Sequence, residues 1–147
     1  MNPLTHAMHL QRIVGFFETL SPADLDRLHE IYTADAAFKD PFNEVRGVPA
    51  IAAIFADMFE TLESPRFVIG ARILQDQDCF LAWEFRFAFR RWRRGVPQVI
   101  RGGSHLVLAA DGRIASHRDY WDAAEELYEK LPLVGAAARW LRRRVSG

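Results

Sequence analysis

The spacing of apolar residues changes from a mainly helical period to an alternating one near residue 66, and helical spacing returns after residue 121. Residues 3–20 repeat apolar side chains at helical spacing, which predicts a helix with one buried stripe: Leu10, Ile13, Val14 and Phe17. Ser21-Pro22-Ala23-Asp24 follows with a serine at the N-cap, a proline at the first helical position and a carboxylate at the third. It predicts a second helix with a buried face of Leu25, Leu28 and Tyr32. Residues 48–62 predict a third helix, which Ser64-Pro65 should end.

From Arg66 onward the alternation predicts consecutive strands over 66–75, 79–93, 98–108 and 114–121, joined by turns. A shorter strand is expected earlier, within 35–42. The long strand is strongly two-faced, because one side is apolar (Leu81, Trp83, Phe85, Phe87 and Phe89) and the other is charged (Glu84, Arg86 and Arg90).

Two further helices are predicted after the last strand, at 123–130 and 133–145, with Asp122 as the N-cap of the first. Helices grouped before a meander of strands indicate an α+β fold with an antiparallel sheet. We expect the sheet to curl over the N-terminal helices as a cone-shaped roll with a cavity inside. The chain is then one domain, 1–147, with a C-terminal helical extension at 123–147.

Composition narrows the function classes. Eleven Phe and four Trp indicate a large core or an aromatic-lined cavity. Lys+Arg and Asp+Glu are both 19, so no net field attracts nucleic acid. We see no metal-ligand spacing or glycine-rich phosphate loop, so no metal and no cofactor is predicted. Without a signal peptide or an apolar stretch long enough to span a bilayer, a cytoplasmic protein without membrane contact is expected.

Three other local patterns have structural interpretations. The single cysteine, Cys79, is predicted to be a small buried strand residue. Gly102-Gly103 inside a strand marks a bulge or a close backbone approach. Arginines around Trp92 suit a solvated hairpin tip, and the cluster at 139–144 suits a helix C-terminus.

Asp40 is the first candidate for chemistry. It lies among apolar residues just before Pro41, which biases it towards an extended conformation at a strand end. A carboxylate held in an apolar pocket can act as a general base. The structural alternative is a turn, in which the side chain accepts backbone N–H bonds.

Three stretches resemble the SnoaL-like and ketosteroid-isomerase-like branch of the NTF2-like superfamily. Residues 32–41 are similar to a Tyr-x-x-Asp-Ala-x-x-x-Asp-Pro segment, 45–51 to a glycine followed by the third helix, and 111–121 to the last hairpin and strand. The resemblance implies the cone fold. It places Asp40 where ketosteroid isomerases keep their proton-transferring carboxylate, Phe16 where they keep an oxyanion-hole tyrosine, and Ser104 where they keep a protonated aspartic acid. Because neither position carries the usual oxyanion donor, the steroid isomerase mechanism is not expected here.

The resemblance also implies that Ala115, His117, Asp119 and Trp121 point into the cone, and that Ile114, Ser116, Arg118 and Tyr120 point outward. His117 and Asp119 then join Asp40 as catalytic candidates, with Asp40 as base, His117 as acid or shuttle and Asp119 as its orienting partner. The expected ligand-binding residues are Phe16, Phe38, Phe55, Met58, Trp83, Phe85, Ser104 and Trp121. The alternative for His117 and Asp119 is a buried structural pair.

Three functions follow from these expectations. The first is a cofactor-independent isomerase, cyclase or hydrolase acting on a small hydrophobic molecule. The second is a non-catalytic domain that binds such a molecule. The third is a dimerisation module, because the charged face of the long strand suits a sheet-to-sheet homodimer, which is common in the family.

Overall fold

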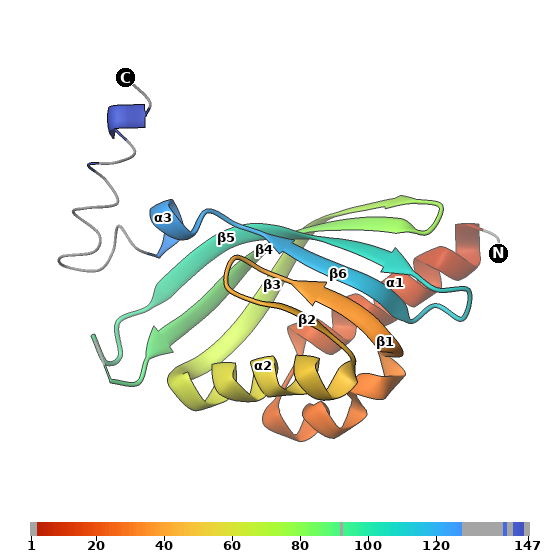
Figure 1. Cartoon of the computed structure of the whole chain (residues 1–147), viewed down its shortest axis with the longest axis horizontal. Coiled ribbons are helices and arrows are strands. Elements are labelled where there is room, and N and C mark those ends of the chain that lie inside the picture. The colour runs from red at the N-terminus through yellow and green to blue at the C-terminus, as the bar shows by residue number, and fades with distance from the viewer. Residues whose placement is uncertain (1–2, 92, 128–139, 141–142, 146–147) are drawn as a thin grey trace.

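A computed structural model describes residues 3–91, 93–127, 140 and 143–145 (Figure 1). Three helical segments and two short strands come first: α1 (Pro3–Glu18), the 3₁₀ helix η1 (Pro22–Glu30), β1 (Tyr32–Lys39), β2 (Glu44–Arg46) and α2 (Val48–Thr61). Four strands and a short helix follow: β3 (Leu62–Gln75), β4 (Asp78–Phe89), β5 (Gln98–Leu108), β6 (Ile114–Tyr120) and α3 (Ala123–Glu126). The predicted α+β class is confirmed. The predicted helix at 133–145 lies mostly outside the described residues.

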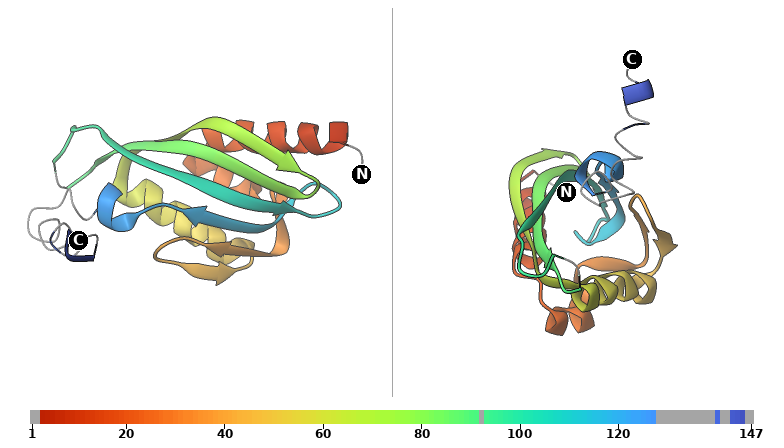
Figure 2. Two further views of the ribbon diagram at one scale, coloured as in Figure 1. Left: turned by 90° about the horizontal axis from the view of Figure 1, so that it is seen from above. Right: turned by 90° about the vertical axis from the view of Figure 1, so that its left-hand side faces the viewer.

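The six strands form one curved, unclosed sheet in the order β2-β1-β6-β5-β4-β3. Figure 2 shows the sheet curling around its axis, with α1 and α2 against it. Neighbouring strands are antiparallel except β1 and β6, which run parallel. The predicted antiparallel sheet therefore holds for every neighbouring pair except this one, because β1 joins the far end of the meander and not a hairpin neighbour.

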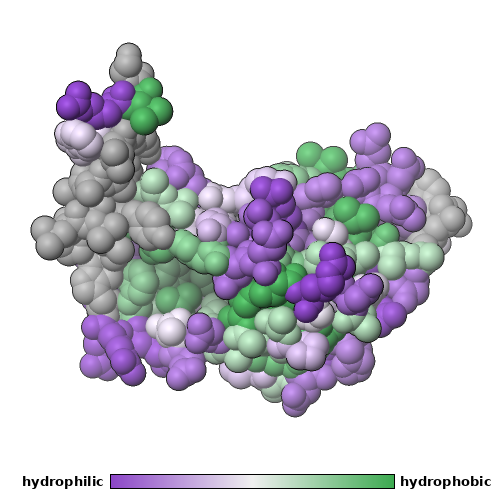
Figure 3. All heavy atoms as spheres, in the orientation of Figure 1, coloured by the Kyte–Doolittle hydropathy of each residue, from purple (hydrophilic) through white to green (hydrophobic). Residues whose placement is uncertain are grey.

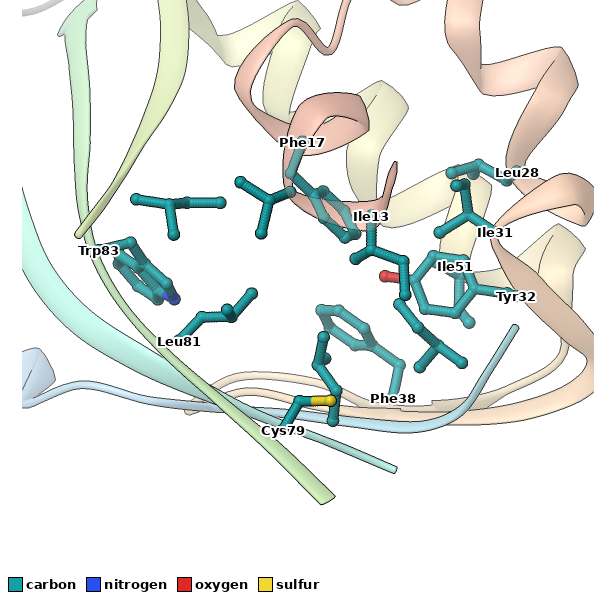
Figure 4. Packing of buried hydrophobic residues seen from close by; sticks show 14 of the residues in the cluster. Ile13, Phe17, Leu28, Ile31, Tyr32, Phe38, Ile51, Cys79, Leu81 and Trp83 are labelled. Carbon is teal, nitrogen blue, oxygen red and sulfur yellow. The ribbon is translucent and has the colours of Figure 1, made fainter. Parts of the chain in front are cut away.

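The core lies between the concave face of the sheet and the helices. Ile13 and Phe17 of α1, Tyr32 and Phe38 of β1, and Leu81 of β4 are all buried there (Figure 4). Fully burying side chains of this size contributes roughly 1.5–3 kcal/mol each, so this apolar contact is what holds the helices on the sheet.

One local prediction of an element boundary needs correction. Ser64-Pro65 does not separate α2 from the next strand, because β3 already begins at Leu62. Instead the pairing of β3 with β4 shifts between Glu63 and Arg66, and Ser64 adopts a positive φ of 50°. The proline therefore sits in a bulge, where its missing N–H leaves no ladder bond unmade.

The predicted facing of β6 holds for its second half only. His117 is buried and Arg118 is exposed, but Ile114, expected outward, is fully buried. The pairing of β5 with β6 shifts between Val107 and Leu108, so one residue of β6 is unmatched and the alternation restarts.

The two adjacent glycines of β5 confirm the predicted close approach. A Cβ atom on Gly102 would lie 2.6 Å from Cη2 of Trp83 and 2.9 Å from the carbonyl oxygen of Tyr120. One on Gly103 would lie 2.5 Å from Cζ of Phe80. Glycine here lets the Trp83 ring approach the backbone of β5 closely, at the site described next.

Candidate active site

A cavity of about 330 Å³ lies between α2 and the concave face of the sheet. Asp40 and Asp119 border it, as do the predicted wall residues Phe38, Phe55, Met58, Trp83, Phe85 and Trp121. Hydrophobic residues gather in a recess on the face shown in Figure 3. Part of the wall was not predicted as such: Phe42, Ile54, Phe67, Phe87, Phe89 and Ile100. The alternation of β4 already placed Phe87 and Phe89 on the correct face.

A second, much smaller cavity of about 30 Å³ lies deeper. His117 and Ser104 border this inner cavity. Four residues border both cavities: Phe55, Phe67, Trp83 and Asp119. Asp119 is therefore the one acidic side chain shared by the two among the described residues.

A chain of four short hydrogen bonds converges on Asp119. On one side Tyr32 Oη lies 2.6 Å from His117 Nδ1, and His117 Nε2 lies 2.7 Å from Asp119 Oδ1. On the other side Trp83 Nε1 donates to Ser104 Oγ at 2.8 Å, and that hydroxyl donates to the same carboxylate oxygen at 2.5 Å. Chains of this kind strengthen each bond by polarisation when they are shielded from water.

The direction of the chain follows from its members. An ionised carboxylate only accepts, so we assign the imidazole proton to Nε2 of His117, which leaves Nδ1 to accept from Tyr32. Burial, with a smaller contribution from the negative charge of Asp119, raises the pKa of Tyr32 well above its usual value. The phenol therefore stays protonated and can hold the imidazole in this tautomer.

Aromatic rings fix the orientation of His117. Its ring lies parallel to that of Tyr32 at a centroid separation of 5.9 Å. Phe38 approaches it edge-on at 4.8 Å and Phe17 at 5.9 Å. His117 is only 6 % exposed, so it cannot reorient without disturbing this packing.

The Asp119 carboxylate is held through one oxygen. Oδ1 accepts from both His117 and Ser104, whereas Oδ2 has no hydrogen-bond partner among the described residues. The side chain is 17 % exposed and borders the larger cavity. This arrangement leaves one carboxylate oxygen available to a ligand.

Asp40 is arranged differently. Its Oδ1 accepts from the backbone N–H groups of Phe42 at 2.8 Å and Asn43 at 2.7 Å, and the Asn43 side-chain amide contacts both carboxylate oxygens. This is the turn geometry that the sequence offered as the alternative to catalysis. Asp40 still borders the cavity, but most of its hydrogen-bonding capacity is used within the turn.

Phe16 and Tyr32 show where prediction and position differ. Phe16 was expected in the pocket wall, yet it borders a separate depression with Arg12 and Arg27, because Phe17 is the neighbour that faces the core. Tyr32 was expected on the second helix and instead begins β1, where it is fully buried. Its hydroxyl among apolar residues was the available signal for the role in the hydrogen-bond chain.

The described part of the chain contains no cluster of three or more potential metal ligands. Within that part, no helix is long and apolar enough to cross a membrane. Asp122 caps α3, as predicted, by accepting from the N–H of Glu125 at 3.1 Å.

Comparison with known proteins assigns the chain to a family. A profile of the SnoaL-like domain matches residues 13–117. The chain belongs to the SnoaL-like domain family. A search of curated proteins found no significant match.

Solved structures agree at the level of fold. A candidate SnoaL-like polyketide cyclase from Jannaschia sp. CCS1 has a TM-score of 0.70 and 16 % identity, covering 85 % of this chain and 92 % of that one. A LEH-like epoxide hydrolase from M. tuberculosis has a TM-score of 0.67 and 18 % identity, covering 92 % and 97 %. A protein with a ketosteroid isomerase-like fold from Catenulispora acidiphila, in complex with trimethylamine, has a TM-score of 0.67 and 16 % identity, covering 78 % and 88 %. At these identities the likeness establishes the NTF2-like fold and leaves the reaction open.

Proposed function

We propose that this SnoaL-like protein is a cofactor-independent acid–base enzyme that acts on a small hydrophobic molecule bound in the 330 Å³ cavity. One observation carries the proposal: Asp119 is oriented through Oδ1 by His117 and Ser104, while Oδ2 remains unpaired among the described residues beside that cavity. A base fixed in position and partly shielded from water suits proton transfer.

The geometry favours roles for the two carboxylates that differ from those first expected. Asp119 is assigned as the base, His117 as the residue that orients it, and Asp40 as the turn residue that shapes the cavity. Asp119 would take a proton from an activated C–H of the substrate and return it to another atom in an isomerisation or cyclisation. In a hydrolase it would take the proton from the attacking water as the new C–O bond forms, and return it to the oxygen released when the epoxide or lactone C–O bond breaks.

Related folds are named for such reactions, since one structural neighbour is a candidate polyketide cyclase and another an epoxide hydrolase. We therefore propose epoxides, enones and lactones with apolar substituents as the first substrates to screen. The test compares turnover by the wild type with that of Asp119→Asn and Asp40→Asn. Asp119→Asn should lower kcat by about 100-fold or more. A smaller loss in Asp119→Asn than in Asp40→Asn would return the base role to Asp40.

A non-catalytic ligand-binding domain is the second candidate, and one observation favours it. The carboxylate of Asp40 and the indole N–H of Trp83 already have partners within the protein, as expected of a cavity that only holds its ligand. Tight binding of a screened compound, without turnover at any pH at which the protein is folded, would select this function.

We also propose that the chain forms a homodimer through the outer face of the sheet. Phe80 and Tyr120 are exposed on that face, at 39 % and 47 %, and Glu84 pairs with Arg86 at 3.0 Å beside them. Analytical ultracentrifugation should give twice the chain mass, and Phe80→Arg should give the monomer. The predicted cytoplasmic location remains a prediction.

A further inference from the structure

The side chains around the larger cavity are unusual in their charge. Three carboxylates border it, Asp40, Asp57 and Asp119, and no lysine or arginine of the described residues does. None of the three forms an ion pair with a lysine or arginine in that part of the chain, and the one basic side chain that pairs with any of them there is His117, on Asp119. The cavity is therefore a region of negative potential.

The hydrogen-bonding groups that border the larger cavity also offer a ligand more acceptors than donors. The amide of Asn43 contacts Asp40, the hydroxyl of Thr61 donates to the carbonyl of Asp57, and the indole of Trp83 donates to Ser104. Among the described side chains of the wall, only the indole N–H of Trp121 has no acceptor. A ligand thus meets many acceptors and few donors, which disfavours an anionic ligand.

The remaining wall supplies aromatic rings. Phe67 and Phe85 stack at 4.7 Å, Phe85 and Phe87 lie 5.1 Å apart, and Trp83 meets Phe67 edge-on at 5.7 Å. Trp121 and Phe42 form a further edge-to-face pair at 5.6 Å on the opposite side, beside Asp40. Ring faces attract organic cations, and the attraction grows when water is excluded.

We infer that this cavity selects apolar organic cations, such as substituted ammonium groups, over neutral and anionic molecules of the same shape. The inference rests on the proposed use of the cavity for a substrate, and it adds that the preferred epoxide, enone or lactone carries a substituted ammonium group. Aromatic faces hold the apolar body and the charge, and the uncompensated carboxylates provide the counter-charge.

The test uses three probes that share a phenyl ring and a tetrahedral head group but differ in charge. They are phenyltrimethylammonium, tert-butylbenzene and benzenesulfonate, titrated into the full chain while tryptophan fluorescence or ligand NMR signals are followed. We expect the cation to bind about fivefold or more tightly than the neutral probe, with the anion weakest. Equal or tighter binding of the neutral probe, preference for the anion, or no binding by any probe would overturn the inference.

Isosteric variants locate the effect. Asp57→Asn and Asp40→Asn each remove one charge while keeping the side-chain shape, and each should lower the cation-to-neutral affinity ratio about threefold. Asp26→Asn, which does not border the cavity, is the matched control and should leave the ratio unchanged. If the cation-to-neutral affinity ratio is the same in both cavity variants as in the wild type, the inference is also overturned. Binding is measured without turnover, so the two proposals can fail separately. A protein without activity can still prefer the cation, and an active protein can show no preference for it.

Discussion

His117 donates a hydrogen bond of 2.7 Å to Asp119 Oδ1. The two residues are two positions apart on the same face of β6. The bond links a buried imidazole, itself held by Tyr32, to the carboxylate that borders both cavities. Strand geometry makes this possible, because residues i and i+2 point the same way.

Replacing His117 should destabilise the fold. His117→Ala removes hydrogen-bond partners from Tyr32 and Asp119 and opens space between three aromatic rings, so we expect a loss of about 2–4 kcal/mol in the free energy of unfolding. Urea denaturation followed by fluorescence measures it. His105→Ala is the matched control, because His105 also pairs with a carboxylate, Asp78, but its side chain is 44 % exposed. A loss from His105→Ala as large as that from His117→Ala would contradict the account.

Asp40 should prove to stabilise the turn through its oxygen atoms and not through its charge. Asp40→Ala leaves the N–H groups of Phe42 and Asn43 without their acceptor, and should cost about 1–2 kcal/mol. Asp40→Asn keeps an acceptor oxygen and should cost less than half as much. Thermal unfolding of the two variants gives the comparison. Equal losses would show that the charge, and not the turn, is what matters.

The glycines of β5 should not tolerate a methyl group. Gly102→Ala brings Cβ against the backbone oxygen of Tyr120, which cannot move aside, so a loss of about 1–3 kcal/mol is expected. Gly70→Ala on β3 is the control, since its nearest atom, the carbonyl oxygen of Ala82, lies 3.8 Å away in ordinary contact. Chemical denaturation of the pair measures the difference, and similar stabilities would contradict the described packing.

The stability of the fold should fall at alkaline pH. Burial, followed by the charge of Asp78, raises the pKa of the Cys79 thiol from 9.0 to about 11, and the pKa of Tyr32 is raised well above 10.0. A raised folded-state pKa gives stability that is fully present below the unfolded value and is lost as pH rises towards the folded value. Unfolding free energy should therefore decline above about pH 9, where Cys79 begins to ionise in the unfolded chain. Denaturation across this range checks it.

Comparing the Tyr32→Phe variant with the wild type isolates the contribution of the Tyr32 phenol to the loss of stability at alkaline pH. Tyr32→Phe should be less stable near neutral pH, because His117 loses its donor, but its stability should fall less steeply above pH 10. Parallel pH curves for the two proteins would mean that Tyr32 does not ionise on unfolding.

Periodicity and turn chemistry predicted most of the architecture. The alternation in β4 located its aromatic face, and the Ser21–Asp24 pattern located the start of η1, where the carboxylate of Asp24 accepts from the Ser21 N–H at 2.9 Å. Such features are local, so neighbouring residues decide them. The bulges at Ser64 and near Leu108 depend on how two strands pair, which no local pattern records.

The candidate site was predicted less completely, for the same reason. Similarity to the family directed attention to Asp40, but only the fold brings Ser104 of β5 against Asp119 of β6 and Tyr32 of β1 against His117. Phe16 and Phe17 are equally apolar, and only packing decides which one faces the core. Sequence could place the chemistry-bearing residues on strands, but it could not show which carboxylate keeps a free oxygen.

A crystal structure of the Asp119→Asn variant with a bound substrate tests the central claim most directly. The side-chain amide nitrogen or oxygen of residue 119 that does not face Ser104 and His117 should lie roughly 3–3.5 Å from the atom that loses its proton. A substrate bound in the cavity with its reacting atom beside Asp40 and away from residue 119, or a substrate bound outside the cavity, would contradict the account.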